Sequence, residues 1–533
     1  MSDAQDPKKS LIEEPPQSIG GILMRLGPGL IIAGSIVGSG ELIATTLTGA
    51  KAGFWLLWLI IVGCVIKVFV QVELGRYSIV TGNTSLDGIQ EVPGPRISTG
   101  RGGINWLLGY WFVMFLFTLA QLGGIVGGVG QALAISAPLT QTGKDFNHIS
   151  DIQKKLLVSE KELDTLRAKN DKGERVNELT QQIASHKAEL QQLTPEGENP
   201  IEYKPTPGID DKIWAAIVTT ITAVVLVIGR YGFIQTFSTL LVGSFTLITI
   251  VNLFALQFND AGWAVTWQDL VNGMSFSLTP ADEVVGDVKP LATALATFGI
   301  IGVGAAELLA YPYWCLEKGY ATFTGPRDES EAWADRARGW LRVMRWDAWC
   351  SMVVYTFATI AFYLLGAAIL GRLQLAPEGP EMIRTLAVMY EPVFGSWTRV
   401  LFLFGAFAVL YSTFFVANAG HARVFPDALR VMGFVSDDER TKKLLLTIFS
   451  GVFPFTCLIV YCFIPAPTVL VLASGLMQAV MLPMIAGAAL YFRYMRSDNR
   501  VAPGKAWDAF LWISSGGMLL AGVVILLMKL KVL

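Results

Sequence analysis

The chain has 533 residues, of which 53% are hydrophobic and only 16% are charged, whereas soluble domains usually carry about a quarter charged residues. This composition excludes an ordinary soluble globular protein and indicates an all-α polytopic membrane protein. The net charge of −2 points to no particular partner, and we expect a lipid bilayer but no nucleic acid. The five cysteines lie in or beside apolar runs without ligand spacing, so we expect neither disulfides nor a cofactor.

The N-terminal segment, residues 1–26, is polar and contains prolines. It has no apolar core of a signal peptide and no small-residue cleavage site. We therefore expect a short cytoplasmic tail ahead of the first membrane span.

Runs of about 18 or more apolar residues predict membrane-spanning helices. The first three lie within 27–136, a polar insertion occupies 137–211, and eight more lie within 212–533. The eleven predicted spans are 27–48, 54–80, 104–136, 212–229, 233–257, 291–317, 347–370, 396–422, 443–464, 467–492 and 508–528.

Two of these spans are interrupted by glycines next to a single acid. Span one carries the sequence GSGE, Gly38 to Glu41, and span six places Gly302 and Gly304 just ahead of Glu307. Lipid satisfies neither a broken backbone nor a carboxylate, so both breaks must line a cavity or be buried in protein. Interrupted spans at matching places in two halves of a chain point to the midplane site of an inverted-repeat transporter.

The loops predict the orientation. Lys and Arg precede span one and cluster after spans two, four, six, eight and ten, which all fall on one side if the spans alternate. By the positive-inside rule the N-terminus is cytoplasmic and the C-terminus external. We expect the cytoplasmic (inner) membrane of a bacterium.

The insertion at 137–211 is external in this topology and predicts a helical hairpin. Apolar residues recur at heptad-like spacing on both sides of the turn sequence KNDKG at 169–173, and their positions are Ile152, Leu156, Leu163, Leu166, Val176, Leu179, Ile183, Leu190 and Leu193. Either this hairpin projects from the transporter, or it binds a partner or a second copy of itself.

Lys67 lies well inside span two. An isolated ammonium at that depth costs at least about 2.5–3.5 kcal/mol, so it needs a partner. Glu41 or Glu307 is the expected partner, which would lower the net charge of the site from −2 to −1. The alternative is a lysine that reaches the cytoplasmic interface beside Glu73.

Motifs in several spans resemble one known family. Span one opens with GPG, span two carries Gln71 and ends in Thr81-Gly82, and span ten contains Gln478 followed by Leu482-Pro483. Together with the span count and the GIIG opening of the span-six break, they resemble the Nramp (natural resistance-associated macrophage protein) family of divalent-metal transporters. The resemblance implies a LeuT-like fold of two inverted five-helix repeats plus an eleventh helix.

The departures from that family change the expected ion. The family's Asp-Pro-Gly-Asn aligns with residues 38–41, and its Met-Pro-His aligns with Ala306-Glu307-Leu308, so the metal-binding Asp, the Met sulfur and the His are absent. Oxygen donors suit Mg²⁺, Mn²⁺ or Ca²⁺ better than softer ions. The predicted metal site consists of Glu41, Glu307, Gly38, Gly304 and Gln478, with Lys67 as the coupling residue.

Three function classes follow. The first is secondary transport of a divalent cation, Mg²⁺ or Mn²⁺ in preference to Fe²⁺ or Cd²⁺, with proton coupling through Lys67. The second is a cation-coupled symporter of a small organic solute such as an amino acid, with Lys67 as a counter-charge. The third is a transporter-derived sensor or scaffold that works through its hairpin. No GxxxxGK[ST] motif and no catalytic constellation are present, so we expect neither ATP hydrolysis nor an enzyme.

Overall fold

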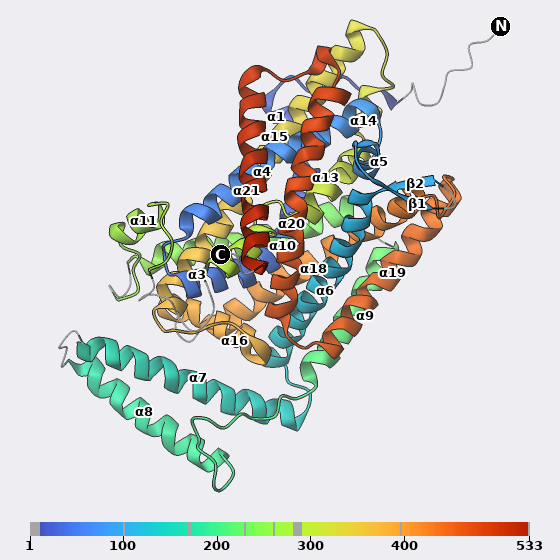
Figure 1. Ribbon diagram of the computed structural model, residues 1–533. Helices are drawn as coiled ribbons and strands as arrows, with labels where there is room; N and C mark the ends of the chain where they lie inside the picture. The colour runs from blue at the N-terminus through green and yellow to red at the C-terminus, as the bar shows by residue number, and fades with distance from the viewer. Residues whose placement is uncertain are drawn as a thin grey trace.

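The computed structural model describes residues 11–99, 102–168, 173–228, 231–258, 262–280, 290–394 and 397–530. Within these ranges the chain forms a body of long helices, with α1 at one end and the α7–α8 hairpin at the other (Figure 1). One short antiparallel strand pair, β1 (Arg96–Thr99) and β2 (Gly102–Asn105), follows the second span.

The first half of the chain holds spans one to five and the hairpin. Its helices are α1 (Ile19–Arg25), α2 (Pro28–Ile36), a π-helical turn (Ser39–Thr45), α3 (Thr46–Ala52), α4 (Leu57–Thr81), α5 (Ser85–Glu91), α6 (Trp106–Ser136), α7 (Gln141–Ala168), α8 (Glu174–Leu193), α9 (Asp210–Ile228), α10 (Tyr231–Leu256) and α11 (Trp267–Gly273).

The second half holds spans six to eleven. Its helices are α12 (Pro290–Phe298), α13 (Ala305–Lys318), α14 (Tyr320–Thr324), α15 (Glu331–Leu365) with a π-helical extension (Gly366–Gly371), α16 (Met382–Ala387), α17 (Glu391–Phe394), α18 (Thr398–Val431), α19 (Glu439–Phe463), α20 (Pro467–Tyr491) with a π-helical end (Phe492–Arg496), and α21 (Lys505–Lys529).

Helices occupy all eleven predicted spans. Eight helices of the described chain are long and apolar enough to cross a membrane unbroken: α4, α6, α9, α15, α18, α19, α20 and α21. Spans one and six are the divided ones, and span five corresponds to α10. Several helices extend beyond the predicted spans. α15 begins at Glu331, so Arg336, Arg338, Arg342 and Arg345, which were expected in the loop before span seven, lie on this helix, and α18 continues to Val431.

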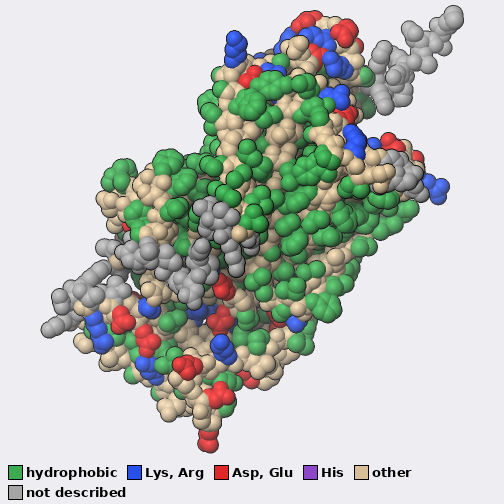
Figure 2. All heavy atoms as spheres, viewed as in Figure 1, with side chains coloured by type: hydrophobic (Ala, Val, Ile, Leu, Met, Phe, Trp, Pro, Cys, Tyr) green, Lys and Arg blue, Asp and Glu red, His purple; other side chains and the backbone are tan. Residues whose placement is uncertain are grey.

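The spans differ in how much protein surrounds them. Within its apolar stretch, α18 is 78% buried and α6 and α15 are 72% buried, whereas α19 is only 28% buried. The first three therefore form the centre, and α19 lies at the rim where lipid would cover it. On the face shown in Figure 2, hydrophobic side chains cover the helical body and charged side chains gather at its two ends.

The two helices of the hairpin pack against each other. Ile149, Ile152 and Leu156 of α7 form a small apolar cluster with Leu190 of α8. The turn predicted at 169–173 lies almost wholly outside the described residues.

A buried arginine joins the hairpin to the loop between spans seven and eight. Arg384 of α16 is 6% exposed, pairs with Asp151 of α7 and donates a hydrogen bond to Asn147 Oδ1 at 2.8 Å. Next to it Lys154 Nζ donates to Thr385 Oγ1 at 3.1 Å. The expectation of a hairpin that simply projects is therefore wrong, because its first helix is bound to α16 of the same chain.

Candidate functional site

The two helix breaks lie against each other. Span one breaks at Gly38, between α2 and the π-helical turn, and span six breaks between α12 and α13, where Gly302 has a φ of +57°. A Cβ at Gly40 would lie 3.0 Å from Ile300 O, so the backbones of the two breaks are in direct contact. The predicted pairing of the two interrupted spans is present in the structure.

Glu41 is the more deeply buried of the two acids. Its side chain is 0% exposed, and Thr359 Oγ1 of α15 donates a hydrogen bond to Oε1 at 3.1 Å. Oε2 is buried with no hydrogen-bond partner among the described residues. A buried carboxylate oxygen without a donor is a place where a cation can bind.

Glu307 lies in the first turn of α13 and is only partly buried. Its Oε1 accepts a hydrogen bond from Ser35 Oγ at 3.3 Å. A Cβ placed at Gly304 would lie 2.5 Å from Glu307 Oε2 and 2.8 Å from Gln478 Oε1, so both oxygens crowd the same glycine. The structure thus brings together Glu307, Gly304 and Gln478, as the sequence predicted.

Gln478 is oriented by its own neighbours. Its Nε2 donates to Gln121 Oε1 at 2.9 Å and to Ser474 Oγ at 3.2 Å, while its Oε1 accepts from Ala306 N at 3.1 Å. Because both sides of the amide have matching partners, its carbonyl oxygen faces the break in span six. Gln121 is a site residue that sequence reasoning missed, and the only signal was a polar residue inside span three.

Gly38 and Lys67 have different neighbours from those predicted. Gly38 faces the Thr413 side chain of α18, which fills the space that a Cβ would need. Lys67 Nζ donates hydrogen bonds to the main-chain carbonyls of Phe298 and of Ile301, the latter at 2.7 Å. Among the described residues no carboxylate lies within ion-pairing distance of this ammonium, so the predicted partners Glu41 and Glu307 are only its electrostatic neighbours.

One further acid links the first span to the second half of the chain. Asp347 of α15 is 1% exposed and accepts hydrogen bonds from Gly27 N at 2.8 Å and from Gly29 N at 2.5 Å. Tyr311 OH of α13 donates to the same carboxylate at 3.1 Å. A carboxylate at these N–H groups caps the positive end of α2. Sequence reasoning assigned Asp347 no role, although the GPG opening of span one leaves such amides uncapped.

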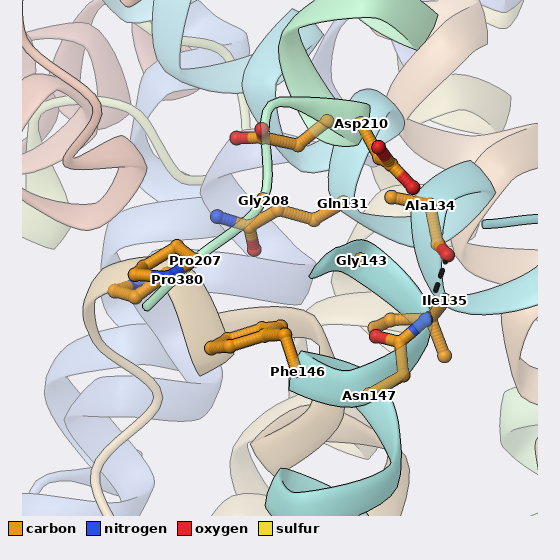
Figure 3. Close-up of a pocket in the computed structure, with 11 residues that line it drawn as sticks. Gln131, Ala134, Ile135, Gly143, Phe146, Asn147, Pro207, Gly208, Asp210 and Pro380 are labelled. Atoms are coloured by element: carbon orange, nitrogen blue, oxygen red, sulfur yellow. Dashed lines mark hydrogen bonds between the residues drawn. The ribbon is translucent and has the colours of Figure 1, made fainter. Parts of the chain in front are cut away.

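A small cavity of about 40 Å³ lies away from the breaks, where α6, α7 and α9 meet (Figure 3). Gln131, Asn147 and Asp210 line it, and Asn147 Nδ2 donates a hydrogen bond to Ala134 O at 2.9 Å. None of its lining residues belongs to span one or span six, so this cavity is part of the hairpin root.

The predicted site side chains Glu41, Glu307 and Gln478 offer oxygen donors, and Cys64 lies beside the span-six break. Two carboxylates, one amide carbonyl and main-chain carbonyls are available, without a histidine or a methionine sulfur among the named groups. No group of three or more His, Cys, Asp or Glu side chains is arranged for a metal ion within the described residues.

Comparisons with known proteins support the same fold. A crystal structure of a histidine-to-alanine variant of the manganese transporter of Eremococcus coleocola aligns with a TM-score of 0.59 and 14% identity over 96% of this chain and 88% of that chain. The same transporter in complex with an aromatic bis-isothiourea substituted compound gives 0.59 and 15%, over 97% and 89%. At these identities the likeness shows the fold alone, and the predicted LeuT-like fold, two inverted five-helix repeats plus an eleventh helix, is confirmed.

Sequence comparison gives the family. Among curated protein sequences no match was found. A family profile described as natural resistance-associated macrophage protein-like matches residues 206–528, which is more than half of the chain. With the two broken spans and the shared fold, this match shows that the chain belongs to the Nramp family.

Proposed function

We propose that this protein is a secondary transporter of a hard divalent metal cation, with Mg²⁺ or Mn²⁺ preferred to Fe²⁺ and Cd²⁺. The observation that carries the proposal is the pair of carboxylates at two touching helix breaks, one of which keeps a buried oxygen without a donor. Membership of a divalent-metal transporter family supports it, as does the name of the similar manganese transporter.

Ion preference follows from the donors. Glu41, Glu307 and Gln478 offer only oxygen, and Ala306 stands where the family carries a methionine. Hard cations prefer such ligands, and Mg²⁺ keeps several waters when it binds through one or two carboxylates.

Proton coupling through Lys67 is a further part of the proposal. Two carboxylates and one ammonium give the empty site a formal charge of −1. An arriving divalent ion would be attracted by the carboxylates but repelled by the Lys67 ammonium. Release of the Lys67 proton would relieve that repulsion without any histidine. Uptake into vesicles with an internal pH dye should show protons moving with the cation in the wild type and no coupled signal in Lys67→Met.

Symport of an organic solute has less support. Such a substrate would need a free N–H group or ammonium for its carboxylate. The Ala306 N–H group donates to Gln478 and the Lys67 ammonium donates to two carbonyls, so these two positive groups are already used.

The test replaces each acid by its neutral isostere. Glu41→Gln and Glu307→Gln should each abolish or strongly weaken divalent-cation uptake in proteoliposomes, because each removes one of the two charged ligands. Glu317→Gln is the matched control, since Glu317 lies on the same helix α13 but pairs with Arg423 away from the break. Unchanged uptake in either break variant, with folded protein, removes that residue from the site.

The membrane orientation belongs to the same proposal. The N-terminus is placed in the cytoplasm, the C-terminus and the hairpin outside a bacterial inner membrane, and the exposed face of α8 is available to a partner. A cysteine introduced at Lys187 should react with an impermeant thiol reagent in intact cells, whereas one introduced at Asp335 should react only after lysis.

A further inference from the structure

The first half of span six ends with main-chain carbonyls that no helix can satisfy. The last carbonyls of any helix lack intrahelical donors. Here the N–H groups of residues 299–301 return to Ala296 and Thr297, which leaves the carbonyl of Phe298 to a side chain. These oxygens, deep in the protein and at the negative end of α12, form a surface that favours a positive charge.

Lys67 fills this position. Its ammonium donates to the carbonyls of Phe298 and Ile301 and lies 4.7 Å from the centre of the Phe298 ring. The side chain is 0% exposed. Carbonyl oxygens at a half-helix C-terminus together with an aromatic face are groups that bind a cation.

Small residues let α4 approach closely enough for this contact. A Cβ at Gly63 would lie 2.8 Å from the Phe298 ring, and a Cβ at Gly302 would lie 2.9 Å from Cys64 Cα. Lys67 follows Gly63 by about one helical turn, so its side chain starts beside the break and reaches the carbonyls from there. The close packing and the lysine therefore act together.

We propose that the carbonyl end of α12 is a binding site for a monovalent cation, and that this chain occupies it with the Lys67 ammonium instead of a mobile ion. The ligands that the emptied site would take are Na⁺, K⁺ or a primary alkylammonium. Binding at this site is independent of the proposed function, whereas its consequence, transport without a requirement for Na⁺, rests on it.

The experiment empties the site and offers it new cations. Lys67→Ala removes the atoms of propylammonium from the side chain, so propylammonium, Na⁺ and K⁺ are the probes, with choline at equal ionic strength as the control that is too large. Purified Lys67→Ala should unfold at a lower temperature than wild type, and the probes should raise its midpoint saturably by about 2–4 °C. Wild type and Lys67→Met, which keeps the volume without the charge, should not respond.

The outcomes are separable. The inference is overturned if Lys67→Met or wild type responds to Na⁺ as strongly as Lys67→Ala. It is also overturned if folded Lys67→Ala responds to none of the probes. If Lys67→Ala yields no folded protein, Lys67→Ser purified in Na⁺ replaces it, and failure of both variants in Na⁺ also counts against the site. Because the unfolding measurement is made without a divalent ion, it tests the monovalent-cation site even if the proposed transport function is wrong. In vesicles, divalent uptake by Lys67→Ala should depend on Na⁺ or propylammonium, and that by wild type should not.

Discussion

At both helix breaks, main-chain carbonyls accept hydrogen bonds from side chains of other helices, and the donors differ between the two breaks. In span one the carbonyl of Gly34, near the end of α2, accepts hydrogen bonds from two hydroxyls of α18, Ser412 Oγ at 3.4 Å and Thr413 Oγ1 at 3.2 Å. In span six the carbonyls at the end of α12 accept from the Lys67 ammonium. Neutral donors satisfy one break and a full positive charge satisfies the other, so the electrostatic balance of the site depends on span six.

The two acids at the breaks differ in how deeply they are buried. Glu41 of span one is fully buried with one oxygen unpartnered, and Glu307 of span six is partly exposed beside Gln478. A cation that first meets the accessible acid and then the buried one would move from span six toward span one. The comparison therefore predicts that removing the carbonyl donor at the span-six break changes the charge of the site, whereas removing the carbonyl donors at the span-one break changes only neutral contacts.

Among the substitutions that compare the two breaks, the largest effect is expected from removing the charge of Lys67. Lys67→Met leaves two acids without a positive neighbour, so the KM for the divalent ion should fall while the maximal uptake rate falls by about tenfold or more, because each 1.4 kcal/mol of tighter binding slows release tenfold. The double variant Ser412→Ala, Thr413→Val removes only neutral hydrogen bonds of about 0.5–1.5 kcal/mol each. Its uptake should change by less than about threefold, and equal losses in both variants would contradict the contrast.

A Cβ added at each break should separate backbone strain from side-chain packing. Gly302→Ala forces a positive φ on alanine and a contact with Cys64 Cα, and should destabilise by about 1–3 kcal/mol. Gly38→Ala meets only the side chain of Thr413. In thermal unfolding, Thr413→Gly should therefore recover most of the Gly38→Ala loss. Cys64→Gly should recover little of the Gly302→Ala loss, because the opposing Cα remains.

Ion preference can be shifted at the span-six break alone. Ala306→Met introduces a sulfur in the first turn of α13, beside Glu307 and Gln478, and should move the ratio of Cd²⁺ to Mg²⁺ affinity by about tenfold, or 1.4 kcal/mol. Competition binding to purified protein measures that ratio. Ala305→Met is the positional control, and tight Cd²⁺ binding by the unmodified protein would contradict the proposed hard site.

The smallest effect is expected at an ion pair outside the bilayer. The Arg500 side chain lowers the pKa of Asp498 to about 2, and Arg327 pairs with the same carboxylate at 2.8 Å. A lowered folded-state pKa stabilises the protein above the unfolded value near 4, and this contribution is lost as the pH falls through about 2. Between about pH 4 and pH 2, Asp498→Asn should lose less thermal stability than wild type. Its uptake at neutral pH should be unchanged, and a loss there would show that this contact reaches the breaks.

Hydropathy and glycine placement were sufficient to predict an all-α membrane protein with two broken spans. A bilayer requires long apolar runs, and it allows a broken backbone only where protein or a cavity surrounds the break. Both features can therefore be recognised in the sequence alone. Glu307 and Gly304 were placed together because they interrupt the same apolar run, whereas Gln478 was added from the family resemblance, and in the structure both side chains lie beside Gly304. The family resemblance added the fold topology.

The partners of the site residues were not predictable in the same way. The acceptors of Lys67 are backbone carbonyls, which every residue carries, so no side-chain pattern distinguishes Phe298 or Ile301. Thr359 and Gln121 look like ordinary polar residues within apolar helices. The docking of the hairpin depends on Arg384 and Asp151, which lie more than 200 positions apart, in two segments that no sequence pattern connects.

The hairpin is held to the helical body at more than one point along α7. Beyond the contact of Asp151 with Arg384, Lys161 Nζ donates a hydrogen bond to Gln374 Oε1 at 3.3 Å, and α7 continues from there to Ala168. A displacement of the loop between spans seven and eight would therefore carry α7 with it. Spin labels at Arg167 and on the helical body would report such a displacement as a change in distance.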